Sequence, residues 1–206
     1  MKLFPGFNVS RETEEALFYI RDSVIKWNPT INLISKGSVV NLWDRHILDS
    51  AQIFTFFIPK GGLWLDFGSG GGFPGLVLAA LSKSLSPGLR FVLVESDARK
   101  CSFLKKISRD LSLSVDVLNA RVEDLSFERV DYISARAVSQ LGRLLVLTEK
   151  FVSRETVCVF LKGGKYQKEV ADARKNWDFE LKLVNSLTSK EGKILILKGV
   201  ERVFGE

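Results

Sequence analysis

Short continuous apolar runs alternate along this chain with stretches in which apolar residues recur every three or four positions. The runs predict strands buried on both faces, as in a parallel sheet. They lie at residues 63–67, 90–95, 115–118, 130–134 and 156–161. The periodic stretches between them, at 74–85, 97–111, 138–151 and 166–176, predict helices. The alternation predicts an α/β fold with a doubly wound, mostly parallel sheet.

Both ends of the chain depart from this alternation. Residues 10–27 predict an amphipathic helix that begins at Ser10 and stops at Asn28 and Pro29. A second helix is expected over residues 38–57, before Pro59. We therefore expect residues 1–60 to form a helical extension packed on a single Rossmann-like unit at 61–206. Runs at 179–187 and 194–197 predict an antiparallel hairpin at the sheet edge.

A glycine-rich loop follows the first strand of the core. Residues 66–75 read D-F-G-S-G-G-G-F-P-G. Glycine allows the chain to turn through backbone angles that a Cβ disfavours, and it lets a ligand approach the bare backbone. Pro74 suits the first turn of the following helix, where its missing N–H is not needed. The unpaired N–H groups at that helix start form a slightly positive floor for a ligand.

Two classes of nucleoside cofactor use such a loop. The S-adenosylmethionine form, D-x-G-x-G-x-G, fits from Asp66 through Gly68 and Gly70 to Gly72. The dinucleotide form, G-x-G-x-x-G, fits in a register shifted to Gly70, with an acidic Glu95 about 20 residues later. A carboxylate at that strand end can accept hydrogen bonds from both hydroxyls of a ribose. The loop predicts a nucleoside cofactor and leaves open which one.

Charged residues outside the loop form a second candidate group. His46 and Asp49 are three positions apart and Arg45 and Asp49 four apart, so all three can share one helix face. Arg136 ends the fourth strand, where side chains of an open α/β sheet point into the ligand crevice. The alternative for each is a structural ion pair. His46 is the single histidine, which removes most schemes that need a nucleophile and a base.

Composition narrows the class of protein further. The chain has 206 residues, which suits one domain with its own core. Two dispersed cysteines and one histidine predict a reduced, cytoplasmic protein without a metal site. Neither a signal peptide nor a membrane-spanning run is expected. The net charge of +6 fits either a polyanionic partner or a solvated basic surface.

With these motifs in view, the chain resembles the bacterial ribosomal RNA small subunit methyltransferase G family, also called glucose-inhibited division protein B. The combination of R-H-x-x-D-S before the glycine loop and G-F-P-G within it is more specific than either part. The matching positions, in the family's order, are 32–33, 43, 45–50, 66–75, 95–96, 100, 103–104, 121–124, 134–137 and 161–163. The resemblance implies a class I methyltransferase fold and S-adenosylmethionine as the cofactor.

The resemblance also implies roles for particular residues. The cofactor would contact Gly68, Phe73, Val122, Glu123 and Arg136, and the pocket would be completed by Asp66, Ser69, Gly70 and Glu95. The catalytic candidates are Arg136 together with Arg45, His46 and Asp49 near the mouth of the active site. The expected reaction is transfer of a methyl group to N7 of a guanine in 16S rRNA of the small ribosomal subunit. The expected protein is a cytoplasmic monomer that needs no metal and no membrane.

Three other functions remain open from the residues themselves. A methyltransferase for a small molecule or a protein would share the cofactor loop and differ in the accessory helices. A dinucleotide-dependent oxidoreductase would use the shifted glycine register. A catalytically inert RNA-binding module would keep the basic surface alone.

Overall fold

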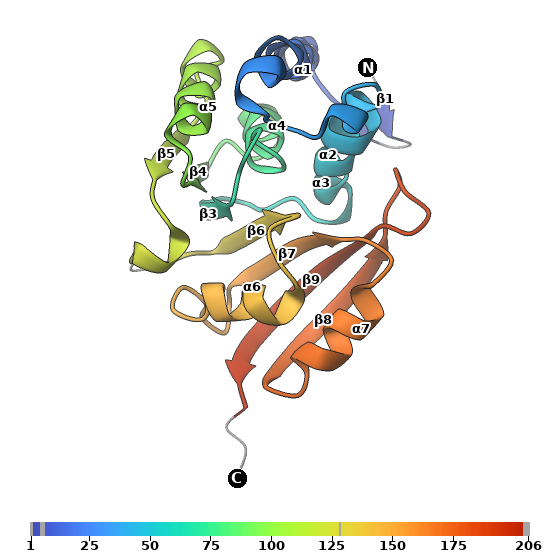
Figure 1. Cartoon of the computed structure of the whole chain (residues 1–206), viewed down its shortest axis with the longest axis vertical. Helices are drawn as coiled ribbons and strands as arrows, with labels where there is room; N and C mark the ends of the chain where they lie inside the picture. The colour runs from blue at the N-terminus through green and yellow to red at the C-terminus, as the bar shows by residue number, and fades with distance from the viewer. Residues whose placement is uncertain (1, 5–6, 128, 204–206) are drawn as a thin grey trace.

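The computed structural model describes residues 2–4, 7–127 and 129–203, and Figure 1 shows a central sheet between two layers of helices. The sheet has seven strands in the order β5-β4-β3-β6-β7-β9-β8. Their bounds are β3 Gly62–Phe67, β4 Leu89–Glu95, β5 Val115–Asn119, β6 Tyr132–Arg136, β7 Val157–Lys162, β8 Trp177–Asn185 and β9 Lys193–Arg202. The first five in spatial order pair in parallel, and β9 is antiparallel to both of its neighbours. The expected mostly parallel sheet with an antiparallel edge hairpin is confirmed.

The edge hairpin is longer than its apolar runs predicted. β9 lies between β7 and β8, so the second strand of the hairpin joins the parallel core. Its pairing with β8 continues past Leu197 to Arg202, which lies opposite Trp177. The sequence reading stopped at Leu197 because Lys198 and Gly199 interrupt the apolar run, although Val200 beyond them is buried.

Alternate residues of each strand supply two separate cores. On one face, Trp64 packs with the helices α1 and α4. On the other, Leu65 and Phe67 pack with α6 and α7. The helices are α1 Arg11–Ile31, α4 Gly75–Leu85, α5 Ala98–Asp110, α6 Leu141–Thr148 and α7 Tyr166–Ala173. Figure 1 shows α1, α4 and α5 grouped on one side of the sheet and α6 and α7 on the other. Within the described ranges, no helix is both long and apolar enough to cross a membrane.

The sequence predicted that helix α1 stops before Pro29. In the structure the helix runs through Pro29 to Ile31. Ser10 caps its start as expected, because its hydroxyl accepts from the Thr13 N–H at 3.2 Å. A proline at this point removes one helical hydrogen bond, to the carbonyl of Ile25, a residue on the exposed side of the helix. The helix ends instead at Asn32, which has a left-handed φ of 50°.

The prediction of a single helix over residues 38–57 is also wrong. The segment is divided into shorter helical pieces, one of which is a π-helix. They are η1 Lys36–Ser38 (a 3₁₀ turn), η2 Trp43–Leu48 (the π-helix), α2 Asp49–Ala51 and α3 Ile53–Phe56. In the π-helix the Asp49 N–H reaches back five residues to the Asp44 carbonyl. Such turns are rare and are frequent at functional sites.

Two short elements were not anticipated. β1 Lys2–Phe4 and β2 Phe7–Asn8 form a small antiparallel pair, and η3 Val122–Asp124 is a 3₁₀ turn after β5. The smaller boundary errors are mostly of one to three residues, which is usual at element ends. Helix α4, for example, begins at Gly75, with Pro74 as its N-cap residue.

Gly75 allows helix α4 to approach the sheet closely. A Cβ at this position would lie 2.3 Å from Leu93 Cδ2 and 2.8 Å from Asp66 Oδ2. Both distances are too short for real contacts, so the backbone of the first helical turn touches the strand side chains directly. The third glycine of nucleoside-binding loops has this packing role.

We predict that Gly75→Ala destabilises the protein by about 1–3 kcal/mol, the usual cost of overpacking a tight core. The matched control is Gly142→Ala in helix α6, where a Cβ would meet nothing within 4 Å. That change should be neutral or stabilising by up to about 1 kcal/mol, because alanine is the better helix former. Urea unfolding of both variants measures the difference. Equal stabilities for the two variants would contradict the close packing at Gly75.

Candidate active site

The glycine loop crosses the carboxyl end of strand β4. Gly68, Gly70 and Gly72 have φ values of 65°, 53° and 91°, which side-chain-bearing residues rarely adopt. The N–H groups of Gly68 and Ser69 donate to the carbonyl of Val94, at 2.9 and 3.2 Å. Gly68 itself is exposed. The loop therefore exposes its backbone at Gly68, beside the ends of β3 and β4, while residues 71–75 are buried.

Glu95 is held at the end of β4 by two backbone donors. Its Oε2 accepts from the Gly70 N–H at 2.9 Å, and its Oε1 accepts from the Asp97 N–H at 2.9 Å. A carboxylate has about four acceptor positions, so these bonds leave capacity for further donors. The side chain is therefore oriented by the glycine loop, and its binding of ribose hydroxyls stays a prediction.

Asp66 is buried at the end of β3 in a short chain of hydrogen bonds. The Trp64 indole N–H donates to Ser134 Oγ at 2.8 Å, and the Ser134 hydroxyl donates to Asp66 Oδ1 at 2.5 Å. The other carboxyl oxygen, Oδ2, is buried without a hydrogen-bond partner among the described residues. Burial raises the pKa of Asp66 to about 6. The Asp66 carbonyl also accepts from the Ser69 hydroxyl at 2.9 Å, which ties the end of β3 to the glycine loop.

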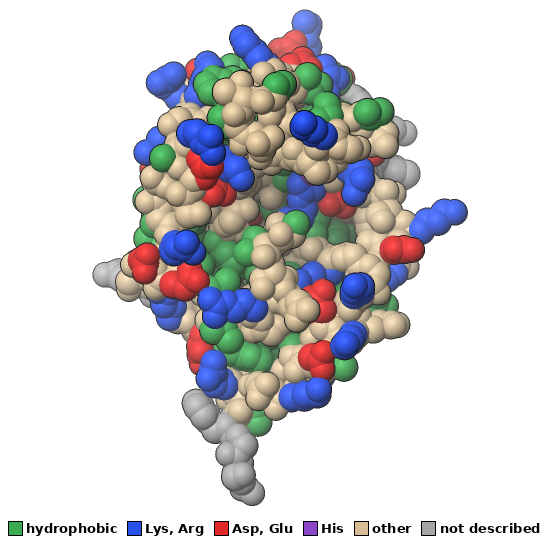
Figure 2. All heavy atoms as spheres, viewed as in Figure 1, with side chains coloured by type: hydrophobic (Ala, Val, Ile, Leu, Met, Phe, Trp, Pro, Cys, Tyr) green, Lys and Arg blue, Asp and Glu red, His purple; other side chains and the backbone are tan. Residues whose placement is uncertain are grey.

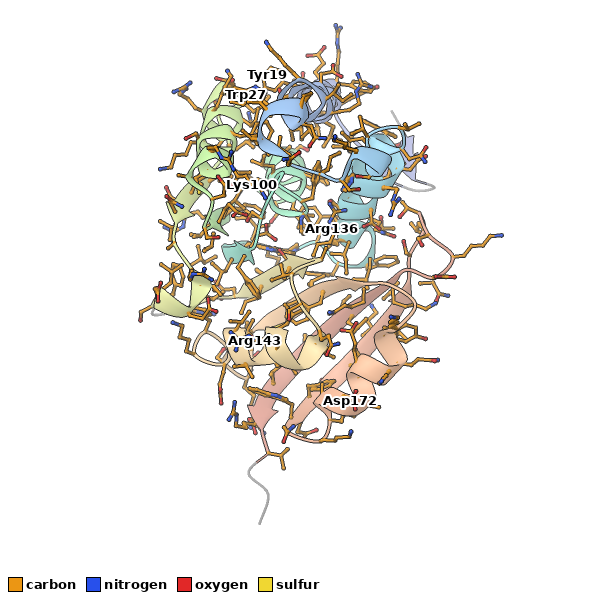
Figure 3. All side chains as sticks on the ribbon, viewed as in Figure 1. Tyr19, Trp27, Lys100, Arg136, Arg143 and Asp172 are labelled. Carbon is orange, nitrogen blue, oxygen red and sulfur yellow. The ribbon has the colours of Figure 1, made fainter. Side chains whose placement is uncertain are left out.

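Arg136 gathers the second group of predicted residues. It ends strand β6, near the centre of the molecule in Figure 3. Its Nη1 donates to the Arg45 carbonyl at 2.8 Å and lies 3.5 Å from Asp49 Oδ2, and its Nη2 contacts His46 Nδ1. Its guanidinium carbon lies 5.2 Å from the centre of the Phe73 ring. The structure therefore joins the N-terminal segment, strand β6 and the glycine loop at one point.

The ion pair of this cluster differs from the spacing prediction. Among the described residues Asp49 pairs with Arg136, whereas Arg45 contributes its backbone carbonyl and keeps its side chain exposed. Arg45 lies within the π-helix, whose wider turn removes the three- and four-residue spacing that the prediction assumed.

His46 is a neutral imidazole in this cluster. Burial, followed by the charges of Arg136 and Arg45, lowers its pKa to about 3. Because its Nδ1 faces an arginine donor, Nδ1 is the acceptor and the proton resides on Nε2. Nε2 is buried without a hydrogen-bond partner in the described part of the chain. Burial also lowers the pKa of Arg136, although an arginine remains charged.

A cleft of about 580 Å³ opens beside this cluster. Figure 2 shows that the face in view is hollowed between the two helical layers, with charged side chains around the hollow. Residues from four parts of the chain line the cleft: the π-helix and α2, the ends of β6 and β7 with the segments that follow them, helix α7, and the β8–β9 turn (residues 186–192) with the start of β9. The arrangement suits a planar polar substrate held between the N-terminal segment and the sheet.

Lys162 and Glu169 are cleft residues that the sequence reading missed. Lys162 Nζ lies 2.7 Å from Glu169 Oε2 and donates to the Ser139 carbonyl at 2.5 Å. Glu169 also accepts from the Leu141 N–H at 2.8 Å, at the start of α6. Lys162 ends the buried strand β7, as Arg136 ends β6. The rule that singled out Arg136 therefore applies to Lys162 as well.

Val122 and Glu123 lie in the 3₁₀ turn that follows strand β5. Val122 is buried in the core on the α6 side. Glu123 is exposed, and its Oε1 accepts from Arg143 of helix α6 at 3.2 Å. The contact of these two residues with a cofactor stays a prediction.

Among the residues that the structure describes, no three histidine, cysteine or acidic side chains gather as they would around a metal ion.

Solved structures share this fold at low sequence identity. A SAM dependent methyltransferase from Aquifex aeolicus matches with a TM-score of 0.58 at 15% identity, over 77% of this chain and 93% of that one. A mutant of MtNAS, solved in complex with S-adenosylmethionine, matches with a TM-score of 0.58 at 15% identity, over 92% and 80%. Together with the strand order and the glycine loop, these similarities assign the fold to the class I methyltransferases.

Sequence relatives specify the family within this class. A family model described as rRNA small subunit methyltransferase G matches residues 13–197. Ribosomal RNA small subunit methyltransferase G of Ruegeria sp. (strain TM1040) is 46% identical over 196 residues, which are 95% of each chain. The protein of the same name from Cereibacter sphaeroides (strain ATCC 17025) is 45% identical over 202 residues, 98% of this chain and 97% of that one. The chain belongs to the rRNA small subunit methyltransferase G family.

The low pKa of His46 predicts a specific pH dependence of stability. The native pKa is about 3 and the ordinary value is 6.5, so the unfolded chain takes up this proton first as the pH falls. Relative to His46→Asn, the wild type should lose about 1–2 kcal/mol between pH 6.5 and about pH 4.5, after allowance for partial solvent screening. Above about pH 7 the difference between the two proteins should be constant.

Urea unfolding of the two proteins across this pH range measures the effect. His46 is the single histidine of the chain, so the other titrating groups are common to both proteins. A difference that stays constant down to about pH 4.5 would contradict a buried neutral imidazole.

Proposed function

We propose that this protein transfers a methyl group from S-adenosylmethionine to N7 of a guanine in 16S rRNA of the small ribosomal subunit. The observation that carries the proposal is the meeting of an open glycine loop with the Arg136–His46–Asp49 cluster, in a chain of the rRNA small subunit methyltransferase G family. S-adenosylmethionine supplies an electrophilic methyl group on a sulfonium.

Several residues fit this cofactor. Gly68 is exposed and has a φ of 65°, which suits glycine, so its backbone is open to a ligand. Glu95 keeps acceptor capacity for ribose hydroxyls. Asp66, Ser69 and Gly70 complete the pocket in our proposal, and Phe73, Val122, Glu123 and Arg136 are the further contacts. Membership of the family favours the S-adenosylmethionine register of the glycines over the dinucleotide register.

The chemistry of guanine N7 suits the residues at the cluster. N7 carries a lone pair and no proton, so no general base is needed before it attacks. A neutral His46, which accepts through Nδ1, is therefore compatible with a role in fixing Arg136. Catalysis then rests on positioning, which supplies up to about 7–11 kcal/mol in favourable cases.

Arg136 is our first candidate for holding the base. Guanine O6 is an acceptor on the same edge as N7, and arginine is its commonest partner. A guanidinium has five N–H donors, and the contacts to Arg45, Asp49 and His46 leave some of them free. Arg45, whose exposed side chain lines the cleft, is the alternative. The target guanine must leave its stack to reach the cleft.

We also propose that the protein acts as a monomer in the cytoplasm. The cluster and the loop come from a single chain, and small ribosomal subunits are cytoplasmic. Transfer to an unprotonated nitrogen requires no metal. A net charge of +6 supports an rRNA partner through phosphate contacts.

The direct test uses labelled S-adenosylmethionine and small subunits from cells that lack this gene. After incubation, the rRNA is digested to nucleosides and labelled 7-methylguanosine is sought by mass spectrometry. Label in that nucleoside, absent with wild-type subunits, is the expected result. Cofactor binding without transfer to subunits or to deproteinised rRNA would instead favour a small-molecule or protein methyltransferase.

We predict that Arg136→Ala lowers kcat on such subunits by about 100-fold, since it removes a positioned donor from the reacting base. Arg136→Lys should recover only part of this loss, because an ammonium cannot reproduce the fork of donors. The control is Arg129→Ala, whose exposed side chain pairs with Asp131 beyond the opposite end of β6.

Initial rates with saturating cofactor measure these effects, and circular dichroism confirms that each variant is folded. Full activity of Arg136→Ala would remove Arg136 from the mechanism.

A further inference from the structure

Two distant segments form facing walls of the cleft, and one buried side chain joins them. Gln52 follows helix α2 and has an exposed fraction of 0%. Its Oε1 accepts from the Leu187 N–H at 2.7 Å, and its Nε2 lies 3.1 Å from Ser186 Oγ. Both partners lie in the β8–β9 turn, about 135 positions after Gln52 in the sequence. The amide therefore connects the N-terminal segment to the edge hairpin.

The same amide orients the carboxylate that pairs with Arg136. Gln52 Nε2 lies 2.7 Å from Asp49 Oδ1, which also accepts from Thr188 Oγ1 at 2.8 Å. The second carboxylate oxygen of Asp49 faces Arg136 Nη1 at 3.5 Å. A continuous path of polar contacts thus leads from the turn, through Gln52 and Asp49, to Arg136.

We propose that Gln52 is a positioning residue for the rRNA substrate. Its side chain holds the β8–β9 turn in place as the wall of the cleft that faces the substrate. This inference rests on the proposed function and adds a residue and a surface to it. Gln52 acts through Asp49 and the turn and does not touch the reacting atoms.

The outward side of the turn suits a nucleic acid. Ser189 of the turn and Lys193 at the start of β9 line the cleft, and Ser189 and Lys190 are exposed. Hydroxyl, lysine and backbone N–H groups are the usual partners of phosphate and sugar oxygens. Such contacts set the register of a nucleic acid on a protein without reading its sequence. A wall fixed in one position thus places the rRNA relative to Arg136.

The contacts explain why glutamine stands at this position. A leucine would fill a similar volume, but it would leave the Leu187 N–H and Ser186 Oγ without these partners and release one donor from Asp49. A buried polar network in which the members are satisfied specifies one arrangement of the groups that it joins. The hydrogen bonds of the Gln52 side chain reach Asp49, Ser186 and Leu187, and none of these belongs to the glycine loop. Of the proposed cofactor contacts the path reaches only Arg136, and that through Asp49, so the loss of Gln52 should affect the rRNA substrate far more than the cofactor.

The test compares Gln52→Leu with the wild type on undermethylated small subunits. We expect kcat/KM for the subunits to fall by about 10- to 100-fold, the scale of small misplacements near a reacting centre. The Kd for S-adenosylmethionine, from calorimetry, should stay within about twofold. Thr188→Val should act in the same direction, and the double variant should lose less than the product of the two effects, because both act on Asp49.

The matched control is Thr156→Val. Thr156 is buried, and its hydroxyl donates to the Val130 carbonyl at 2.8 Å near the amino end of β7, away from the cleft. This variant should lose thermal stability while it keeps its kcat/KM for subunits. It separates the loss of a buried hydrogen bond from the loss of positioning.

Three results would overturn the inference. The first is a kcat/KM of Gln52→Leu within about twofold of the wild type. The second is a loss of cofactor affinity as large as the loss of kcat/KM. The third is an equal loss of kcat/KM in Thr156→Val. If the wild type itself leaves no label on subunits, the proposed function fails and the inference fails with it. If the wild type labels subunits and Gln52→Leu labels them equally well, the inference alone fails.

Discussion

The guanidinium of Arg136 carries a charge at a position where only 15% of its side chain reaches water. A buried charge is costly unless partners surround it. The sheet places Arg136 at the end of β6, but its partners come from the N-terminal segment: the Arg45 carbonyl, His46 Nδ1 and the Asp49 carboxylate. The need to satisfy this one group therefore draws residues 45–49 onto the edge of the sheet where the glycine loop lies.

The site follows from that attachment. Phe73 of the glycine loop lies under both Arg136 and His46, so the same contacts bring the proposed cofactor surface next to the proposed base-holding residues. The π-helix over Trp43–Leu48 turns the Arg45 carbonyl and the His46 ring toward one guanidinium. Methyl transfer to an unprotonated nitrogen asks for little proton chemistry and much positioning. A cluster in which Arg136 is held in place with donors left free, and in which the imidazole stays neutral, fits that demand.

The sequence predicted the layers of the fold because buried strands and amphipathic helices space their apolar residues differently along the chain. It also predicted Arg136, Glu95 and the glycine loop, since each stands at a strand end. It failed where local pattern and tertiary contact disagree: α1 passes through Pro29, and the helix around His46 is broken. Gln52 left no signal, because its partners lie about 135 positions away and only the fold brings them together. Lys162 left the same signal as Arg136, since it too ends a buried strand.

Amide hydrogen exchange tests most directly whether Arg136 holds the N-terminal segment to the sheet. In Arg136→Ala, the amides of Trp43–Leu48 should exchange at least about tenfold faster than in the wild type, since local opening reflects local contacts. The amides of β3 and β4 should keep their protection, as they should throughout in Arg129→Ala. Unchanged exchange over Trp43–Leu48, or an equal loss of protection in every element, would contradict the account.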